Sequence, residues 1–398
     1  MSEQRVGVVA RLTEPGGVQS VALSMIKGLN RRGIVPDVLW DVPPSHTLLE
    51  NAGVKADFHH VKFPFSTFLI DKMPLSLRYL AFLINAVDGN RFRGVYDFVY
   101  TVNQLFVFPP DFPHLYFLSG PPLLPQLDIP PPGIKGVPLA FFKWIYRTFY
   151  RARLPIYDYQ PGRNFVINSY YTARLFKEAH GIDLPVVHPP IDVSSRSFEP
   201  DDLPRRDSLV FFSRIVYYKR PEMVMALARR HPQFRTVIMG GVQPHRRPYF
   251  DDLRERARAE GLNVVFIDNP PNERVREELA RARFYIFPAI NEHFGMTTPE
   301  AIASGAIPFV HDSGGQVEIV NDDRCRFVDA EFFEKFRSLV ELPDAELQRI
   351  RQKLVAHVHE YSEEAFISKV IPYLDGVVQR PSMNGAGESM LPAGHHER

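Results

Sequence analysis

The chain of 398 residues carries 47 basic and 46 acidic residues, and its formal net charge of +1 excludes an overall field that would recruit nucleic acid or a strongly anionic surface. With 45% hydrophobic residues it holds enough apolar material for two cores, so we expect a globular protein of two domains. Its one cysteine, Cys325, excludes a disulfide framework and a thiolate metal site, and we expect a buried thiol.

The beginning of the chain indicates a protein that is not exported. The apolar stretch from Val6 to Ala10 is too short for the core of a secretory signal, and no cleavage pattern follows it. No run of about 18 apolar residues occurs, so we expect no segment that spans a bilayer. We therefore expect a cytoplasmic protein, with any membrane contact being peripheral and at the inner face of the membrane.

In the first half, short β-rich apolar runs alternate with helical patterns, which is typical of parallel α/β architecture. The expected strands are Val6–Ala10, Val35–Trp40, Asp97–Val102, Leu115–Leu118, Asn164–Ile167 and Val186–Val187. Between the first two strands, apolar residues recur at helical spacing from Val18 to Leu29, and Gly33 ends the predicted helix. The first unit is therefore predicted to be βαβ.

Two aromatic segments, 63–87 and 138–151, have a different pattern. The second combines aromatic and basic residues at helical spacing, and the first has a similar composition. One interpretation is an interfacial helix, with rings at headgroup depth and cations on anionic lipid. The other is an amphipathic helix packed on its own sheet. The sequence leaves both interpretations open.

A polar, proline-containing stretch at 199–207 indicates a domain boundary. The second half then repeats the alternation in a cleaner doubly wound pattern. Its expected strands are Ser208–Phe212, Arg235–Met239, Val264–Ile267, Phe284–Pro288 and Ile307–Val310. Its expected helices are one that begins at Pro221, followed by Tyr249–Gly261, Pro271–Ala282 and Thr298–Gly305.

These patterns predict an α/β protein with two Rossmann-like domains, at 1–192 and 193–360. Residues 361–378 continue a helical pattern that starts near Pro343. One interpretation is a C-terminal helix that returns to the first domain. The stretch 379–398 is rich in Gly, Pro, Ser, Met and His without periodicity, so we expect a disordered tail.

The first candidate site is the turn Glu14-Pro15-Gly16-Gly17, which lies between the first strand and the first helix. Two glycines there would let backbone N–H groups approach an anion at a helix N-terminus. The turn lacks the third glycine of the dinucleotide-binding fingerprint, so an ordinary strand-to-helix turn remains the alternative.

The second candidate is a pair of cations that bracket a short loop. Arg214 follows the strand Ser208–Phe212, and Lys219 precedes the helix that begins at Pro221. Ligands of α/β sheets bind beyond the carboxyl ends of strands, and a guanidinium with an ammonium suits a diphosphate. A solvated surface cluster is the alternative interpretation.

The third and strongest candidate is the segment from Asn291 to Glu300. Thr298 suits an N-cap, Pro299 the first helical position and Glu300 the first turn. Glu292 and Glu300 stand eight residues apart on either side of a glycine-containing backbone. One acid could accept hydrogen bonds from sugar hydroxyls while the other faces a reacting centre.

This segment resembles the E-x7-E element of retaining glycosyltransferase family 4. The resemblance implies the GT-B fold, in which the parallel sheets of two Rossmann-like domains face a central cleft. Further segments resemble the branch of that family that contains lipid-linked-oligosaccharide mannosyltransferases. They are Ala303-Ser304-Gly305, His311 to Gly315, Glu318-Ile319-Val320, Asn168 to Ala173 and His188 to Asp192. The order of these motifs extends the resemblance from about residue 6 to about residue 374.

The resemblance implies that Arg214 and Lys219 bind a donor diphosphate and that Glu300 holds the donor ribose. Glu292 would lie against the donor sugar as a catalytic residue. Further implied donor contacts come from the backbone of Phe294, Gly295, Met296 and Thr297, from Gly16 and Gly17 of the other domain, and from Asp268 beside the base. The family needs no metal, no D-x-D pair occurs in the chain, and no cofactor is implied.

One position departs from the branch. Its members usually carry a histidine in the stretch that corresponds to Tyr116–Pro122, where this chain has Ser119. A serine can hydrogen-bond a sugar hydroxyl but cannot supply an imidazole, so reduced or altered activity is one outcome. We still nominate Ser119 as a catalytic residue.

The resulting hypothesis is a retaining hexosyl transfer from a nucleotide diphosphate sugar, with GDP-mannose as first choice. The acceptor would be a glycan or a polyprenyl-linked glycan. Two alternatives stay open: a nucleotide-sugar-binding protein with lost or altered catalysis, and an epimerase or phosphorylase on the same fold.

Overall fold

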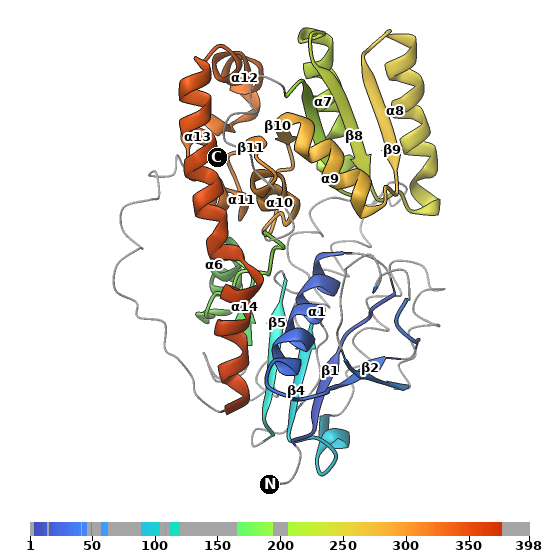
Figure 1. Cartoon of the computed structure of the whole chain (residues 1–398), viewed down its shortest axis with the longest axis vertical. Helices are drawn as coiled ribbons and strands as arrows, with labels where there is room; N and C mark the ends of the chain where they lie inside the picture. The colour runs from blue at the N-terminus through green and yellow to red at the C-terminus, as the bar shows by residue number, and fades with distance from the viewer. Residues whose placement is uncertain are drawn as a thin grey trace.

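A computed structural model describes residues 4–13, 16–40, 42–45, 49, 57–62, 89–103, 108, 112–119, 165–193 and 206–375. They form two sheets of parallel strands, one in each half of the chain (Figure 1). The expected turn residues Glu14 and Pro15, the aromatic segments 63–87 and 138–151, and the tail at 379–398 lie outside the described residues.

The first sheet has the strand order β3-β2-β1-β4-β5-β6. Its strands are β1 (Val6–Val9), β2 (Asp37–Trp40), β3 (His59–Lys62), β4 (Phe98–Val102), β5 (His114–Leu118) and β6 (Phe165–Ile167). In the described part of this half, the helices are α1 (Gly17–Asn30), the short η1 (Gly89–Phe92) and α6 (Tyr170–His180). The chain order reverses between β1 and β4, which is the Rossmann arrangement.

The second sheet has the order β12-β11-β10-β7-β8-β9, which is the same arrangement starting from β7. Its strands are β7 (Ser208–Phe212), β8 (Arg235–Gly240), β9 (Val264–Asp268), β10 (Ala282–Phe287), β11 (Ile307–His311) and β12 (Arg326–Phe327). Its helices are α7 (Pro221–Arg230), α8 (Arg247–Ala259), α9 (Asn272–Arg281), α10 (Thr297–Ala303), α11 (Gln316–Ile319), α12 (Phe332–Val340) and α13 (Asp344–Val358).

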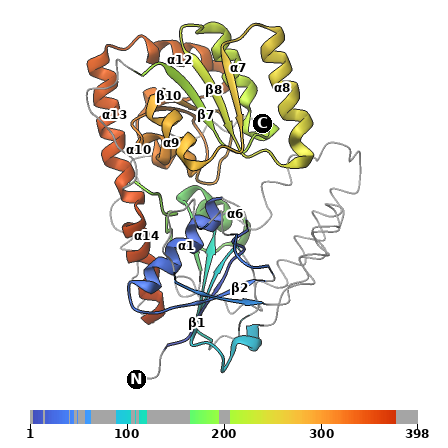
Figure 2. The same cartoon turned by 45° about the vertical axis from the view of Figure 1, so that its right-hand side comes forward.

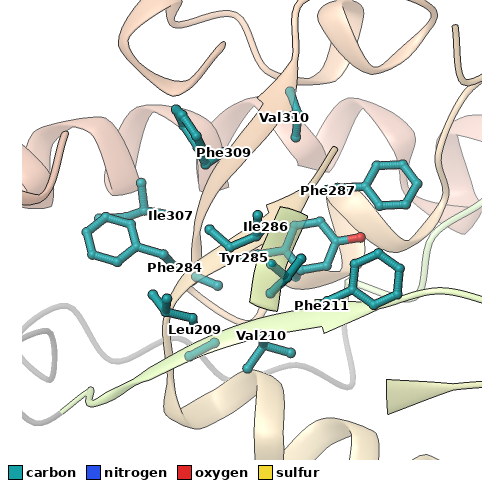
Figure 3. Close-up of a cluster of buried hydrophobic side chains, with 14 of the residues drawn as sticks. Leu209, Val210, Phe211, Phe284, Tyr285, Ile286, Phe287, Ile307, Phe309 and Val310 are labelled. Atoms are coloured by element: carbon teal, nitrogen blue, oxygen red, sulfur yellow. The ribbon is translucent and has the colours of Figure 1, made fainter. Parts of the chain in front are cut away.

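The central strands of both sheets are apolar because both of their faces are covered. In β7 and β10, successive side chains point to opposite faces, and both sets are buried. Figure 3 shows the result, with Phe211, Phe284 and Phe309 packed from neighbouring strands. Cys325 is fully buried in the same core, as the sequence predicted.

The last described part of the chain packs on the first half. After α13, the helix α14 (Glu363–Val370) and the turn η9 (Ile371–Asp375) run alongside α1, as the two views in Figures 1 and 2 agree. Phe366 and Val370 belong to the same buried cluster as Leu29. Lys27 on α1 forms an ion pair with Glu363 at 2.8 Å.

Most of the expected strands are confirmed, and Ser208–Phe212 has the predicted bounds. Strand β3 and strand β12 were not predicted. The expected strand at Val186–Val187 is reduced to one bridge between Ile167 and Val186. Among the described residues, no helix is both long enough and apolar enough to cross a membrane. The domain boundaries at 192 and 360 stay predictions.

His114 at the start of β5 is a buried imidazole whose Nδ1 lies 2.6 Å from the carbonyl oxygen of Phe112. Burial lowers the pKa of His114 to about 4, although the bond to Phe112 acts in the opposite direction. The unfolded chain binds the proton at the ordinary pKa of about 6.5. Protonation therefore favours the unfolded state as the pH falls from about 6.5 to about 4.

We expect this one group to remove about 3 kcal/mol of folding free energy between neutral pH and about pH 4. The variant His114→Phe keeps an aromatic ring and removes the titration. Urea denaturation of both proteins at about pH 7.5 and about pH 5 would measure the difference. A gap between wild type and variant that does not change with pH would contradict this assignment.

Candidate active site

The predicted site residues follow the strands at which each sheet reverses its order. Gly17 comes after β1, Arg214 after β7 and Glu292 after β10. Strand β7 pairs with β10, and β1 pairs with β4. Loops that follow neighbouring parallel strands diverge at this point of the sheet and leave room for a ligand between them.

Lys219 is buried, and its ammonium group forms an ion pair with the Glu292 carboxylate. The same ammonium lies 5.2 Å from the centre of the Phe287 ring at the end of β10. The neighbouring Arg220 points elsewhere, since its guanidinium donates to Asp329 at 2.8 Å. The two adjacent cations therefore have different partners, and only Lys219 contacts the predicted acid.

Glu292 is ionised in this setting. Burial alone would raise the pKa of Glu292, but Lys219, assisted by His293 and Arg214, holds that pKa below its ordinary value. Its side chain is 19% exposed. The structure thus brings Arg214, Lys219 and Glu292 within electrostatic reach of one another.

The backbone around Glu292 is fixed by the loop that follows β11. The Glu292 carbonyl oxygen accepts a hydrogen bond from the Gly315 N–H at 2.7 Å, and the Asn291 N–H donates to the Ser313 hydroxyl at 2.8 Å. Gly314 has a φ of +75° and lies against the Glu292 backbone so closely that a Cβ would collide with its nitrogen and oxygen. Glycine is required at this position for both reasons.

Helix α10 begins earlier than predicted. The helix starts at Thr297, and its N-cap is Met296, which makes no side-chain cap bond. Thr298 and Pro299 are thus the second and third helical residues, and the expected N-cap at Thr298 is wrong. Glu300 does lie in the first turn.

The first residue of this helix contacts Tyr285 on β10. The Tyr285 hydroxyl, drawn in Figure 3, contacts the Thr297 hydroxyl at 2.7 Å and donates to the Phe212 carbonyl at 3.2 Å. Burial raises the pKa of Tyr285, and the nearby charges of Glu300 and Glu292 raise it further. Both predicted acids therefore lie near one buried phenol.

The first half holds three of the predicted positions, Gly16, Gly17 and Ser119. A Cβ on Gly17, the first residue of α1, would collide with the sulfur of Met296, so the glycine turn and the start of α10 lie in contact range. Gly16 precedes the helix as its N-cap. Ser119 follows β5, and its backbone N–H donates to the Asn103 side chain at 2.7 Å.

Asp268 lies apart from this group. It ends β9, the edge strand of the second sheet, and forms an ion pair with Arg247 at 2.6 Å. The Arg247 side chain lowers the pKa of Asp268. Phe294 is part of the buried core, so only its backbone could face a ligand. Gly295 has a φ of +85°, which suits the glycine found there.

Sequence reasoning missed how the two halves are joined beside the site. Glu318 on α11 accepts hydrogen bonds from the backbone N–H groups of Tyr170 and Tyr171 at 3.0 and 2.8 Å. The His188 ring lies 3.1 Å from the same carboxylate. Each of these residues falls in one of the motifs named in the sequence analysis, so a signal for them existed. Their contact with one another, however, arises only in the tertiary structure.

Within the described ranges, no cluster of three or more His, Cys, Asp or Glu side chains could hold a metal ion.

Comparisons with known proteins agree with the architecture. Residues 197–352 match the family model described as glycosyl transferases group 1. The solved structure of HepE from Anabaena in complex with UDP and glucose superposes with a TM-score of 0.67 at 16% identity, over 94% of this chain and 100% of that one. At this identity the likeness concerns the fold alone.

Two relatives match parts of the sequence. The lipopolysaccharide core biosynthesis mannosyltransferase LpcC of Rhizobium leguminosarum bv. viciae is 27% identical over 147 residues, 35% of this chain and 41% of the relative. The GDP-Man:Man(3)GlcNAc(2)-PP-Dol alpha-1,2-mannosyltransferase of Dictyostelium discoideum is 22% identical over 236 residues, 54% of this chain and 46% of the relative. The chain thus spans less than half the length of these curated relatives.

Two six-stranded parallel sheets of this order match the GT-B fold of solved glycosyltransferase structures. Within this fold, residues 197–352 are similar to the family of glycosyl transferases group 1.

Gly314 offers a test of the backbone that carries Glu292. We expect Gly314→Ala to weaken binding of a nucleotide sugar and to lower the melting temperature, because the new Cβ would displace the Glu292 backbone. Gly261→Ala is the matched control, since Gly261 has a φ of +64° and open space around it. Gly261→Ala should lower the free energy of unfolding by only about 1 kcal/mol, which is the ordinary penalty for an alanine in the left-handed backbone conformation. Equal effects of the two changes would show that the Glu292 contact is unimportant.

Proposed function

We propose that the protein transfers a hexose from a nucleoside diphosphate sugar to a glycan or lipid-linked glycan acceptor, with retention of configuration and without a metal. The observation that carries this proposal is the ion pair of the buried Lys219 with the partly buried Glu292, with Arg214 nearby, between the loops after β7 and β10. That position is the switch point of the second sheet, and Gly17 approaches it from the first half.

The chemistry of the proposed step fits these charges. Cleavage of the bond between the sugar and the diphosphate leaves a negative charge on the departing group. Arg214 can bind its oxygens through a planar fork, and Lys219 can add a point charge. Fixed cations aimed at a developing negative charge stabilise the transition state without reorganisation.

The acids would bind the neutral parts of the donor. Ionised Glu292 can accept hydrogen bonds from sugar hydroxyls, and Glu300 can accept them from the ribose. Backbone groups from Phe294 to Thr297 would contact sugar and phosphate, and Asp268 would lie beside the base. Gly16, Gly17 and Ser119 would complete the site from the first half.

Mannose is the first choice of sugar, because the Rhizobium and Dictyostelium relatives are named as mannosyltransferases. The Dictyostelium protein is named for a GDP-mannose donor and a dolichyl-diphosphate-linked glycan acceptor. A polyprenyl-linked acceptor at the cytoplasmic face of a membrane would follow from this similarity. A thermal-shift screen of GDP, UDP and their sugars tests the donor, since a ligand of the native state raises the apparent stability.

Glu300→Ala is the variant that tests the donor site. We expect titration calorimetry to show donor affinity lowered about 10- to 100-fold, as loss of a charge-assisted hydrogen bond predicts. The free energy of unfolding should change by less than about 1 kcal/mol. Glu334→Ala, which removes a carboxylate from the first turn of α12, is the matched control and should bind as wild type. Unchanged donor binding by Glu300→Ala would refute the assignment.

Metal independence has its own test. Transfer activity should survive EDTA, because the fixed cations Arg214 and Lys219 take the role that a divalent metal has elsewhere. The measurement is the rate of sugar transfer before and after chelation. Activity that is lost on chelation and restored by Mn²⁺ would rule out the proposed mechanism.

A binding protein without turnover is the second candidate, and Ser119 is the observation that favours it. Its hydroxyl accepts a hydrogen bond from the Asn103 amide and so is already engaged. Donor binding with neither transfer nor hydrolysis across a panel of acceptors would support this candidate. An epimerase or a phosphorylase would be recognised by its products with UDP-GlcNAc or phosphate.

A further inference from the structure

Arg220 combines an unfavourable backbone conformation with a side chain that has two partners. Among the described residues that are not glycine, Arg220 has a positive φ, and so do Asn103, Asn269 and Asn291. Asparagine tolerates this left-handed region, whereas an arginine is strained there. Arg220 has a φ of +59° between the short turn η4 (Tyr217–Lys219) and α7. Strained residues of this kind cluster at functional sites, which directs attention to its side chain.

The guanidinium of Arg220 connects three segments of the second half. One of its nitrogens donates to the Pro288 carbonyl oxygen at 3.2 Å, and another donates to the Asp329 carboxylate at 2.8 Å. Pro288 directly follows β10, and Asp329 begins the short helix η7 (Asp329–Glu331) after β12. One side chain therefore joins the loop before α7 to the segments that follow β10 and β12.

Asp329 extends this connection toward the acid of the candidate site. Its carboxylate lies 3.6 Å from Nε2 of His311, and Nδ1 of the same ring lies 2.8 Å from the Ser313 hydroxyl. That hydroxyl accepts a hydrogen bond from the Asn291 N–H at 2.8 Å. Asn291 directly precedes Glu292, so this series of contacts ends beside the acid of the ion pair.

The loops after β7 and β10 are therefore joined twice. The inner connection is the ion pair of Lys219 with Glu292, and the outer connection is Arg220 with Pro288 and Asp329. A donor diphosphate would compete with Glu292 for the Lys219 ammonium and so weaken the inner connection. The outer connection uses no group that is assigned to the donor, so it stays intact while the donor is bound.

We propose that Arg220 is a positioning residue, which holds Lys219 and Glu292 at the separation that transfer requires through its bonds to Pro288 and Asp329. The inference deepens the proposed function and rests on it. A partly exposed ion pair such as Arg220 with Asp329 contributes little to stability. Stability alone therefore does not account for an arginine in this strained conformation.

The first experiment compares Arg220→Gly with wild type in the full chain, with the donor Kd from calorimetry and kcat from a transfer assay. We expect the donor Kd to stay within about threefold of wild type and kcat to fall about 100-fold, the scale of a small misplacement of a reacting group. The melting temperature should change little, since glycine accepts the positive φ. Arg229→Ala, which removes the partner of Glu260 from the last turn of α7, is the control and should match wild type.

The second variant, Asp329→Asn, removes the carboxylate and leaves the backbone of Arg220 unchanged. We expect kcat to fall about 10-fold, because the bond to Pro288 remains. The double variant of Arg220→Gly with Asp329→Asn should be no slower than Arg220→Gly alone, because both changes break the same connection. Losses of kcat that multiply in the double variant would overturn the proposal.

Two further results would overturn it: an unchanged kcat in Arg220→Gly, or a parallel loss of kcat and donor affinity, which would make Arg220 a ligand of the donor. Failure of the proposed function looks different, because wild type itself would then transfer nothing. Hydrogen exchange of residues 289–293 still tests the inference in that case. Exchange should be faster in Asp329→Asn than in wild type and Arg229→Ala, and unchanged exchange would refute the positioning role.

Discussion

The ion pair of the buried Lys219 and the partly buried Glu292 is the interaction on which the rest of the site depends. Two charges taken from water are stable only when each compensates the other, so neither loop can shift alone without leaving an uncompensated charge. The pair also requires β7 and β10 to be neighbours, as the strand order provides. This ion pair therefore coincides with the reversal point of the second sheet.

The sequence predicted the central strands well, because their burial on both faces produces continuous apolar runs such as Ser208–Phe212. It did not predict β3, where His59-His60-Val61-Lys62 is an exposed edge strand without an apolar pattern. It also placed the start of α10 too late, since capping rules consider local residues only. The contact from Tyr285 to Thr297 comes from another element.

The sequence predicted which residues belong to the candidate site, but it did not predict which of them contact one another. Lys219 and Arg220 are equivalent cations in the sequence, yet one contacts Glu292 and the other Asp329. Likewise, nothing local indicates that Glu318 caps the helix beginning at Tyr170. Pairing of this kind depends on how loops of the two sheets meet, which is information that local patterns do not carry.

The packing of α14 on α1 has a consequence for how the polypeptide matures. Gly28 of α1 lies directly beneath Ile371, and Phe366 and Leu374 complete the core formed by the first strands. During synthesis, these closing residues leave the ribosome long after the strands they cover. An apolar face of α1 on the amino-terminal sheet therefore stays uncovered until α14 and η9 have emerged. The carboxyl-terminal half, whose core is built from consecutive segments, is free to fold first.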